Sequence, residues 1–277
     1  MRTCLVRVVL GAGMVGGAGC GDGSTNPSDG TASYETTHFI VVDESGAPRS
    51  LIDSLAAVLE FQWPRVGEFL VGFVPPERVR FNLRAGPGIP YAALADNSMN
   101  QWRETLSFED IPHELTHLWT RSSRGAFLEE GIAVHVTHVL QPASATANPY
   151  RAQPPHAWVA LFEQFGSTIP LETALSASGL SYDFHGSSAD ASAWQIYLEA
   201  GSFTQWVLDR FGYAFWSDMY RTAHPAISLG VPLEELETAW LMAAQDAFPQ
   251  PLACEEALAT LPLTGREEFW CARARGE

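Results

Sequence analysis

Two histidines and a glutamate in the run His113-Glu114-Leu115-Thr116-His117 have the types and the spacing of a metal site. Residues four apart on an α-helix lie on the same face, so both imidazoles can point at one ion. Glu114 lies beside them, where its carboxylate can take a proton from a water held by that ion. This pattern on a helix is typical of zinc sites that activate water, although the same residues also occur on ordinary solvated helices. We therefore predict that the run binds Zn²⁺ and that Glu114 acts as general base.

The neighbouring residues predict the helix that must carry this run. Asp110 can serve as the N-cap residue, and Pro112 then falls in the first turn, where a missing N–H costs nothing. Leu115, Leu118 and Trp119 give the helix an apolar face. The histidines consequently lie within the helix itself.

A catalytic zinc ion usually has three protein ligands and one water. The next carboxylates belong to the run Phe127-Leu128-Glu129-Glu130-Gly131-Ile132-Ala133. With the histidine run, this segment resembles the gluzincin zinc metallopeptidases, in particular their aminopeptidase-like branch, where the glutamate of Trp-Leu-x-Glu-Gly-x-Ala is the third ligand. Phe127 stands in the place of the tryptophan. The resemblance implies that Glu130 completes the site. Glu129 is the alternative ligand, and an acidic first helical turn would explain both glutamates without a metal.

A later segment, Tyr197 to Gly212, resembles the helix that follows the zinc site in the same peptidases. The resemblance implies that Tyr197 donates a hydrogen bond to the oxyanion formed during hydrolysis, a role that suits a neutral phenol facing developing negative charge. A tyrosine of the protein core would fit the same position. His185, in a segment rich in Gly and Ser, is the alternative oxyanion donor.

Taken together, the resemblance implies a zinc-dependent peptidase in which a zinc-activated water attacks a peptide bond and Glu114 passes its proton to the leaving amine. The Gly-x-Met-Glu-Asn motif, with which the aminopeptidases recognise a substrate amino terminus, has no clear match here. An endopeptidase is therefore favoured over an aminopeptidase. Two other functions stay open: a non-catalytic surface lipoprotein that binds zinc, and a zinc hydrolase of a non-peptide amide.

The start of the chain predicts export. Residues 1–19 read as a secretory signal peptide, because Arg2 and Arg7 flank an apolar stretch too short to span a membrane. The run that ends at Cys20 resembles the lipobox of bacterial lipoproteins, which implies a lipid on Cys20 and a location at the cell envelope. Plain secretion is the alternative. Residues 20–32 are then a flexible tether behind the lipidated cysteine.

The remaining cysteines agree with an oxidising compartment. Cys254 and Cys271 are the pair left once the signal and Cys20 are set aside. A disulfide between them would close a loop in the tail of residues 251–277 and stabilise it by about 3 kcal/mol. Two unpaired thiols are the alternative.

The charge of the chain limits its partners. The formal net charge is −16 at pH 7, which disfavours nucleic acid and anionic lipid headgroups. We expect a monomer that acts on a peptide or protein and that touches a membrane only through the lipid on Cys20.

The patterns along the chain predict an α+β fold. Residues 33–100 form a small mixed β-sheet lobe, with strands at 38–42, 78–84 and 91–95 and a helix at 48–71 that Pro64 kinks or splits. Residues 101–250 form a mainly helical lobe, with later helices at 158–165, 193–211, 215–223 and 233–248. By the resemblance, the zinc site lies in the cleft between the lobes. Residues 91–95 are the candidate edge strand for an extended peptide.

Overall fold

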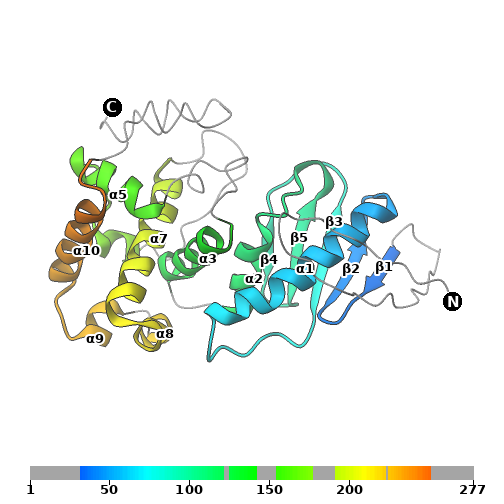
Figure 1. Cartoon of the computed structure of the whole chain (residues 1–277), viewed down its shortest axis with the longest axis horizontal. Coiled ribbons are helices and arrows are strands. Elements are labelled where there is room, and N and C mark those ends of the chain that lie inside the picture. The colour runs from blue at the N-terminus through cyan, green and yellow to red at the C-terminus, as the bar shows by residue number, and fades with distance from the viewer. Residues whose placement is uncertain (1–31, 122–124, 142–153, 177–190, 223, 251–277) are drawn as a thin grey trace, which may run out of the picture. The chain divides into compact units, whose positions relative to one another are not determined.

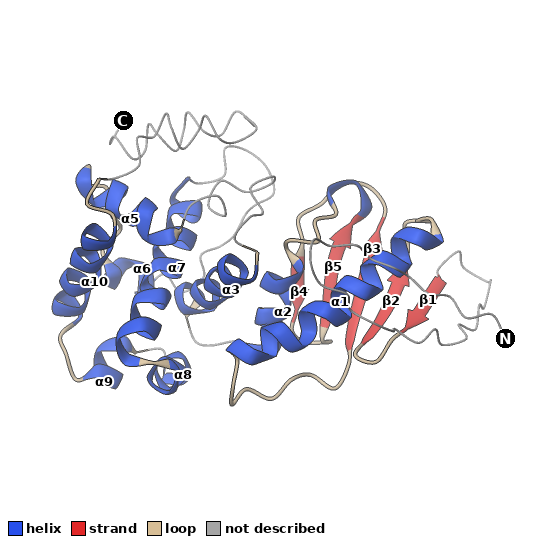
Figure 2. Cartoon of the chain, in the orientation of Figure 1, coloured by secondary structure: helices blue, strands red, loops and turns tan. Residues whose placement is uncertain are grey.

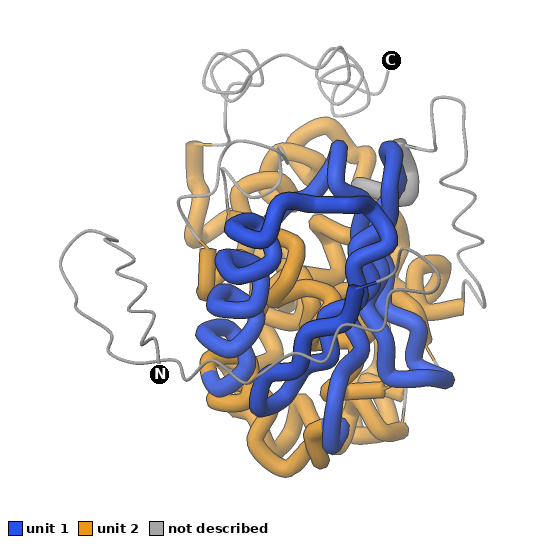
Figure 3. Tube along the Cα trace, turned by 90° about the vertical axis from the view of Figure 1, so that its right-hand side faces the viewer, with its two compact units in different colours: residues 1–64, 76–108 blue, residues 65–75, 109–277 orange. Residues whose placement is uncertain are grey.

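The computed structural model describes residues 32–121, 125–141, 154–176, 191–222 and 224–250 (Figure 1). The chain divides into two compact units, Met1–Pro64 with Pro76–Phe108, and Arg65–Pro75 with Glu109–Glu277 (Figure 3). The predicted signal peptide, Cys20, His185, Cys254 and Cys271 lie outside the described residues. Within the described residues, every helix is too short or too polar to cross a membrane.

The first unit is built on a mixed five-stranded sheet. Its strands are β1 (Ala32–Glu35), β2 (Phe39–Asp43), β3 (Val79–Arg84), β4 (Tyr91–Ala93) and β5 (Ser98–Trp102). They lie in the order β1-β2-β3-β5-β4, with the three inner strands parallel and both outer strands antiparallel to their neighbours. The predicted mixed sheet is confirmed, and β4 lies at an edge as expected.

The helix α1 (Arg49–Phe69) makes the crossover that parallel strands β2 and β3 require. It buries Ile52, Leu55 and Leu59, and its Trp63 meets the ring of Phe39 edge-on at 5.4 Å. The helix continues without a break through Pro64, so the predicted split does not occur. A proline removes one backbone hydrogen bond, and the buried residues on either side of it hold the chain helical. A 3-10 turn (Arg103–Thr105) ends the unit.

The second unit is helical in its described part (Figure 2). Its helices are α2 (Ile111–Thr120), α3 (Ala126–Leu140), α5 (Pro155–Gln164), α6 (Leu171–Ser176), α7 (Ala191–Phe211), α8 (Tyr213–Thr222), α9 (Pro225–Leu229) and α10 (Leu233–Ala247). The expected sequence of sheet first and helices second is confirmed. The short helices α6 and α9 were not predicted, because one or two turns give no clear period.

The long helix α7 lies at the centre of this unit and contacts α3, α5, α8 and α10. Its buried Phe203 meets Trp240 of α10 edge-on at 5.6 Å and Phe127 of α3 at 5.9 Å. These rings anchor α3 to the core, and α3 carries one of the candidate ligands.

Candidate metal centre

The helix α2 presents the histidine run as the sequence predicts. Asp110 occupies the N-cap position, with Pro112 in the first turn, but its side chain makes no capping hydrogen bond to the described helix. The helix ends where Arg121 adopts φ 55°, an uncommon conformation for a residue with a Cβ. The Tyr220 hydroxyl of α8 donates a hydrogen bond to the Arg121 carbonyl over 2.9 Å and holds this turn.

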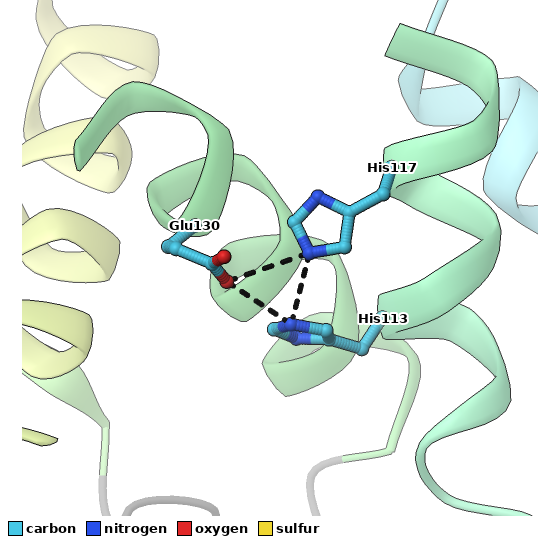
Figure 4. A group of neighbouring side chains, drawn as sticks. All are labelled: His113, His117 and Glu130. Carbon is cyan, nitrogen blue, oxygen red and sulfur yellow. Dashed lines mark hydrogen bonds and ion pairs between the residues drawn. The ribbon is translucent and has the colours of Figure 1, made fainter. Parts of the chain in front are cut away.

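Three side chains converge in front of α2 (Figure 4). The Nε2 atoms of His113 and His117 are 3.2 Å apart, and Glu130 Oε2 of α3 lies 3.2 Å from the first and 3.4 Å from the second. The structure therefore brings together both predicted histidines and Glu130. The alternative Glu129 is not part of this group.

The spacing of these atoms is compatible with a zinc ion. Zinc binds nitrogen and oxygen ligands at about 2.0–2.2 Å in tetrahedral geometry, so two of its ligand atoms lie about 3.3 Å apart. All three separations lie close to that value. Two imidazoles and one carboxylate are also a donor set that zinc accepts, with a corner left for water. In the described part of the chain, no other group of three such residues lies close enough to share an ion.

The group is largely buried, and its polar atoms face one another. His113 is 8% exposed and Glu130 is 8% exposed. Within the described structure, His113 Nδ1 and Glu130 Oε2 are buried without a hydrogen bond. Buried polar atoms are normally satisfied, and one that is not calls for an explanation such as an ion. A metal ion between the three side chains supplies it for the carboxylate oxygen.

The charges in the group are strongly coupled. Burial would lower the pKa of His117, but the Glu130 carboxylate outweighs it and raises that pKa to about 9. Burial would raise the pKa of Glu130, and the two imidazoles instead hold it well below its ordinary value. The site thus favours a positive charge next to Glu130, which a divalent cation would provide.

Glu114 is buried beside the two histidines at 7% exposure. Burial raises the pKa of its carboxyl, and the carboxylates of Glu130 and Asp110 add to the rise, while the imidazoles oppose it. A carboxylate whose pKa is raised is a better proton acceptor near neutral pH. The position and the environment both suit a general base.

Tyr197, on α7, lies next to the group from a third helix. Its ring centroid is 6.1 Å from that of His113, with the planes 30° apart. This places an aromatic ring of α7 against one of the candidate ligands. Tyr197 therefore lies near the candidate ligands. Its role as a hydrogen-bond donor to the oxyanion stays a prediction.

The site belongs to one unit. His113, Glu114, His117, Glu130 and Tyr197 all lie in the second unit. The expected cleft between the two lobes stays a prediction.

Comparison with known proteins gives distant likenesses among solved structures. No family model and no curated protein matches the sequence. Among solved structures, the chain is similar to an M1 zinc metallopeptidase from Deinococcus radiodurans, with a TM-score of 0.43 and 14% identity over 88% of this chain and 51% of that one. A mutant M1 zinc metallopeptidase from the same organism matches with the same score and identity over 76% of this chain and 51% of that one. The chain spans about half the length of these structures. A likeness at this distance does not assign a function, which has to come from the site.

Proposed function

We propose that the protein is a zinc-dependent peptidase, with His113, His117 and Glu130 as the metal ligands and Glu114 as the general base. The observation that carries the proposal is the triangle of ligand atoms with separations of 3.2, 3.2 and 3.4 Å, the spacing of tetrahedral zinc. Bound there, zinc would lower the pKa of a water to about 7 and polarise a carbonyl.

The side chains divide the remaining chemistry between them. Glu114 accepts the proton of the attacking water and then delivers it to the nitrogen of the leaving amine. Tyr197 donates a hydrogen bond to the oxygen that becomes negative during attack, because a neutral phenol can stabilise that charge. The coupling of Glu130 to both imidazoles keeps the three ligands facing one point before an ion arrives.

An extended peptide is the substrate we propose. β4 is an edge strand, hydrogen-bonded to β5 on one side. An edge strand offers its free backbone groups to an extended chain, which would then run beside it. This mode of binding uses a segment in mid-chain and agrees with an endopeptidase. Export, a lipid on Cys20 and a monomeric state remain part of the proposal.

A non-catalytic zinc protein is the competing function. A structural zinc is usually closed by four protein ligands, whereas the group in the described residues has three. It would also have no use for a buried carboxylate at Glu114. Both observations favour catalysis.

The test compares metal content with cleavage. Purified protein, dialysed and then analysed for metal, is incubated with a mixed peptide library with and without a chelator. We expect about one zinc per chain and cleavage that the chelator abolishes. Glu114→Gln should keep the zinc and lose at least about 100-fold in rate, while the control Glu129→Gln keeps both. Full activity in Glu114→Gln would overturn the general-base assignment.

The remaining outcomes identify the alternatives. Zinc without turnover of any peptide would favour the binding protein. Turnover of small acyl amides but not of peptides would favour the hydrolase of a non-peptide amide.

A further inference from the structure

The residue that follows Glu130 is a glycine in the interior of α3. Glycine inside a helix is less stable than alanine, so its presence needs a reason. Here a Cβ on Gly131 would lie 2.6 Å from the backbone carbonyl oxygen of Ala200 on α7 and would also overlap Thr204 Oγ1. No side chain fits at this position, and the two helices touch through their backbones.

A second glycine makes the reciprocal contact from α7. A Cβ on Gly201 would lie 2.5 Å from Cγ1 of Val134 on α3 and 3.3 Å from Cγ of Pro155 on α5. Gly131 and Val134 are one turn apart on α3. We call this pair of approaches, Gly131 against α7 and Gly201 against α3, the glycine contact.

The glycine contact has a cost that marks it as specific. Thr204 Oγ1 is fully buried against Gly131, and among the described residues it finds no hydrogen-bond partner. A buried hydroxyl without a partner is unfavourable. The close approach of the helices is therefore kept although it leaves a polar atom unsatisfied.

The contact lies between two of the proposed functional residues. Glu130 immediately precedes Gly131, and Tyr197 precedes Ala200 by one helical turn. Glu130 reaches the histidines of α2, and Tyr197 lies against His113 of the same helix. Each of the helices α2, α3 and α7 thus contacts the other two. Glu130 of α3 meets the histidines of α2, Gly131 of α3 meets the backbone of α7, and Tyr197 of α7 meets His113 of α2. A shift between α3 and α7 therefore changes the contacts that both helices make with α2.

We infer that Gly131 is a positioning residue of the metal centre, whose missing side chain sets the distance between α3 and α7 and so holds Glu130 at ligand distance from both histidines while Tyr197 stays against His113. The inference rests on the proposed function in one respect, that Glu130 is a metal ligand. Ligand sets tolerate displacements of only about 0.5 Å, less than the space that a methyl group needs.

The experiment measures metal binding and its geometry rather than turnover. Gly131→Ala is compared with the control Gly125→Ala, at the N-cap position of the same helix, where a Cβ meets nothing within 4 Å. Both variants are titrated with zinc against a chelator and examined with Co²⁺ by visible absorption. We expect zinc binding about ten- to a hundred-fold weaker in Gly131→Ala and an altered cobalt spectrum, with both unchanged in Gly125→Ala. Wild-type affinity and spectrum in a folded Gly131→Ala would overturn the inference.

A second pair of variants tests the contact from α7 and leaves α3 intact. Thr204→Ile adds a methyl group on the side that faces Gly131, and Thr204→Val keeps the shape of threonine. Weaker zinc binding in Thr204→Ile with wild-type binding in Thr204→Val supports the inference even if Gly131→Ala does not fold. Wild-type binding in Thr204→Ile contradicts it.

The two proposals fail in different ways. A wild-type protein that takes up no zinc would overturn both. A protein that binds zinc and hydrolyses no amide would overturn the peptidase alone, because the effect of Gly131→Ala on metal binding does not depend on turnover.

Discussion

Two groups of side chains that contain histidine, both in the second unit, show opposite behaviour. At the metal centre, His113 and His117 face each other and the Glu130 carboxylate, and the pKa of His117 is raised to about 9. Elsewhere in the unit, His156 of α5 is 7% exposed, and burial lowers its pKa to about 4 despite the opposing charge of Asp209. Both groups are buried, so burial alone does not tell a candidate ligand from a structural histidine.

The hydrogen bonds separate the two groups. Trp240 Nε1 donates to Ser202 Oγ over 2.9 Å, and Ser202 Oγ lies 3.0 Å from His156 Nδ1. The Ser202 hydroxyl thus bonds both the Trp240 N–H and the His156 imidazole, and the tautomer of His156 decides which of the two is the donor in the second bond. This chain ties α5, α7 and α10 together and needs no ion. At the candidate metal centre, three atoms that could each bind a metal ion instead face one point. Such convergence is the arrangement that could hold a metal ion, whereas a closed chain of donors and acceptors serves the structure.

The largest effect expected from this comparison is the loss of metal in Glu130→Gln. The change keeps the size of the side chain and removes its charge, so the zinc affinity of the site should fall by more than about 100-fold. Metal analysis after dialysis measures it, with Glu129→Gln as the control on the same helical turn. Full zinc content in Glu130→Gln would remove Glu130 from the ligand set.

We call the hydrogen-bonded chain of Trp240, Ser202 and His156 the structural group. Truncation of its histidine should act on stability alone. His156→Ala leaves a cavity and removes a hydrogen-bond partner of the Ser202 hydroxyl, so we expect a loss of about 3–4 kcal/mol in the free energy of unfolding. Denaturant unfolding of the metal-free protein measures it. Zinc affinity of the folded variant should equal that of the wild type. A variant with unchanged stability and weakened zinc binding would show that the two groups are not distinct.

The sequence predicted which side chains of the candidate metal centre lie together better than it predicted the surrounding structure. The spacing of His113 and His117 and the resemblance at Glu130 located three side chains that the structure brings together. Such spacing works because a helix has a fixed period. The role of Gly131 could not be predicted, because it depends on a backbone carbonyl of another helix. His156 carries no motif, and its partners come from α7 and α10.

The sheet shows the same limit. The strand β5 was not predicted, because its buried residues include Ser98, Asn100 and Gln101 and hide the alternation of a strand. Asn82 of β3 donates to Asn100 Oδ1 over 3.1 Å, so part of this polar burial is satisfied between strands. A pattern of hydrophobic residues cannot reveal a partner on another strand. Of the strands that were predicted, β2 and β3 are rich in buried apolar residues, whereas β4 has no buried residue.

The structural group also predicts how stability depends on pH. The folded pKa of His156, about 4, lies below the unfolded value of about 6.5. Between these values the unfolded chain binds more protons, so stability is complete above pH 6.5 and is lost as the pH falls towards 4. We expect His156 to account for about 2–3 kcal/mol of the loss between pH 7 and pH 4. Burial also lowers the pKa of His135 to about 4, with His138 and His156 contributing, so that residue adds in the same direction.

Unfolding of the chelated protein across this pH range measures the effect. His156→Gln, which cannot be protonated, should flatten the dependence, and the slope that remains should belong to His135 and to the other acid-sensitive groups. An unchanged slope in His156→Gln would mean that the pKa of His156 in the folded protein lies near its unfolded value.

The smallest effect concerns the middle of the hydrogen-bonded chain. Ser202→Ala removes one hydroxyl and leaves the Trp240 N–H and the His156 Nδ1 atom without their partner. Each loss costs about 1 kcal/mol, and the small cavity lets the groups relax, so we expect about 1–2 kcal/mol in total. The double variant Ser202→Ala with His156→Ala should lose less stability than the sum of the two single variants, because residues of one hydrogen-bond network are not independent. In a double variant with Glu130→Gln, the loss of unfolding free energy caused by Ser202→Ala should add fully to that of Glu130→Gln. A coupling between Ser202 and Glu130 in the unfolding free energy would mean that the metal centre and the structural group share a network. The two groups would then be parts of one connected core and could not be treated as independent.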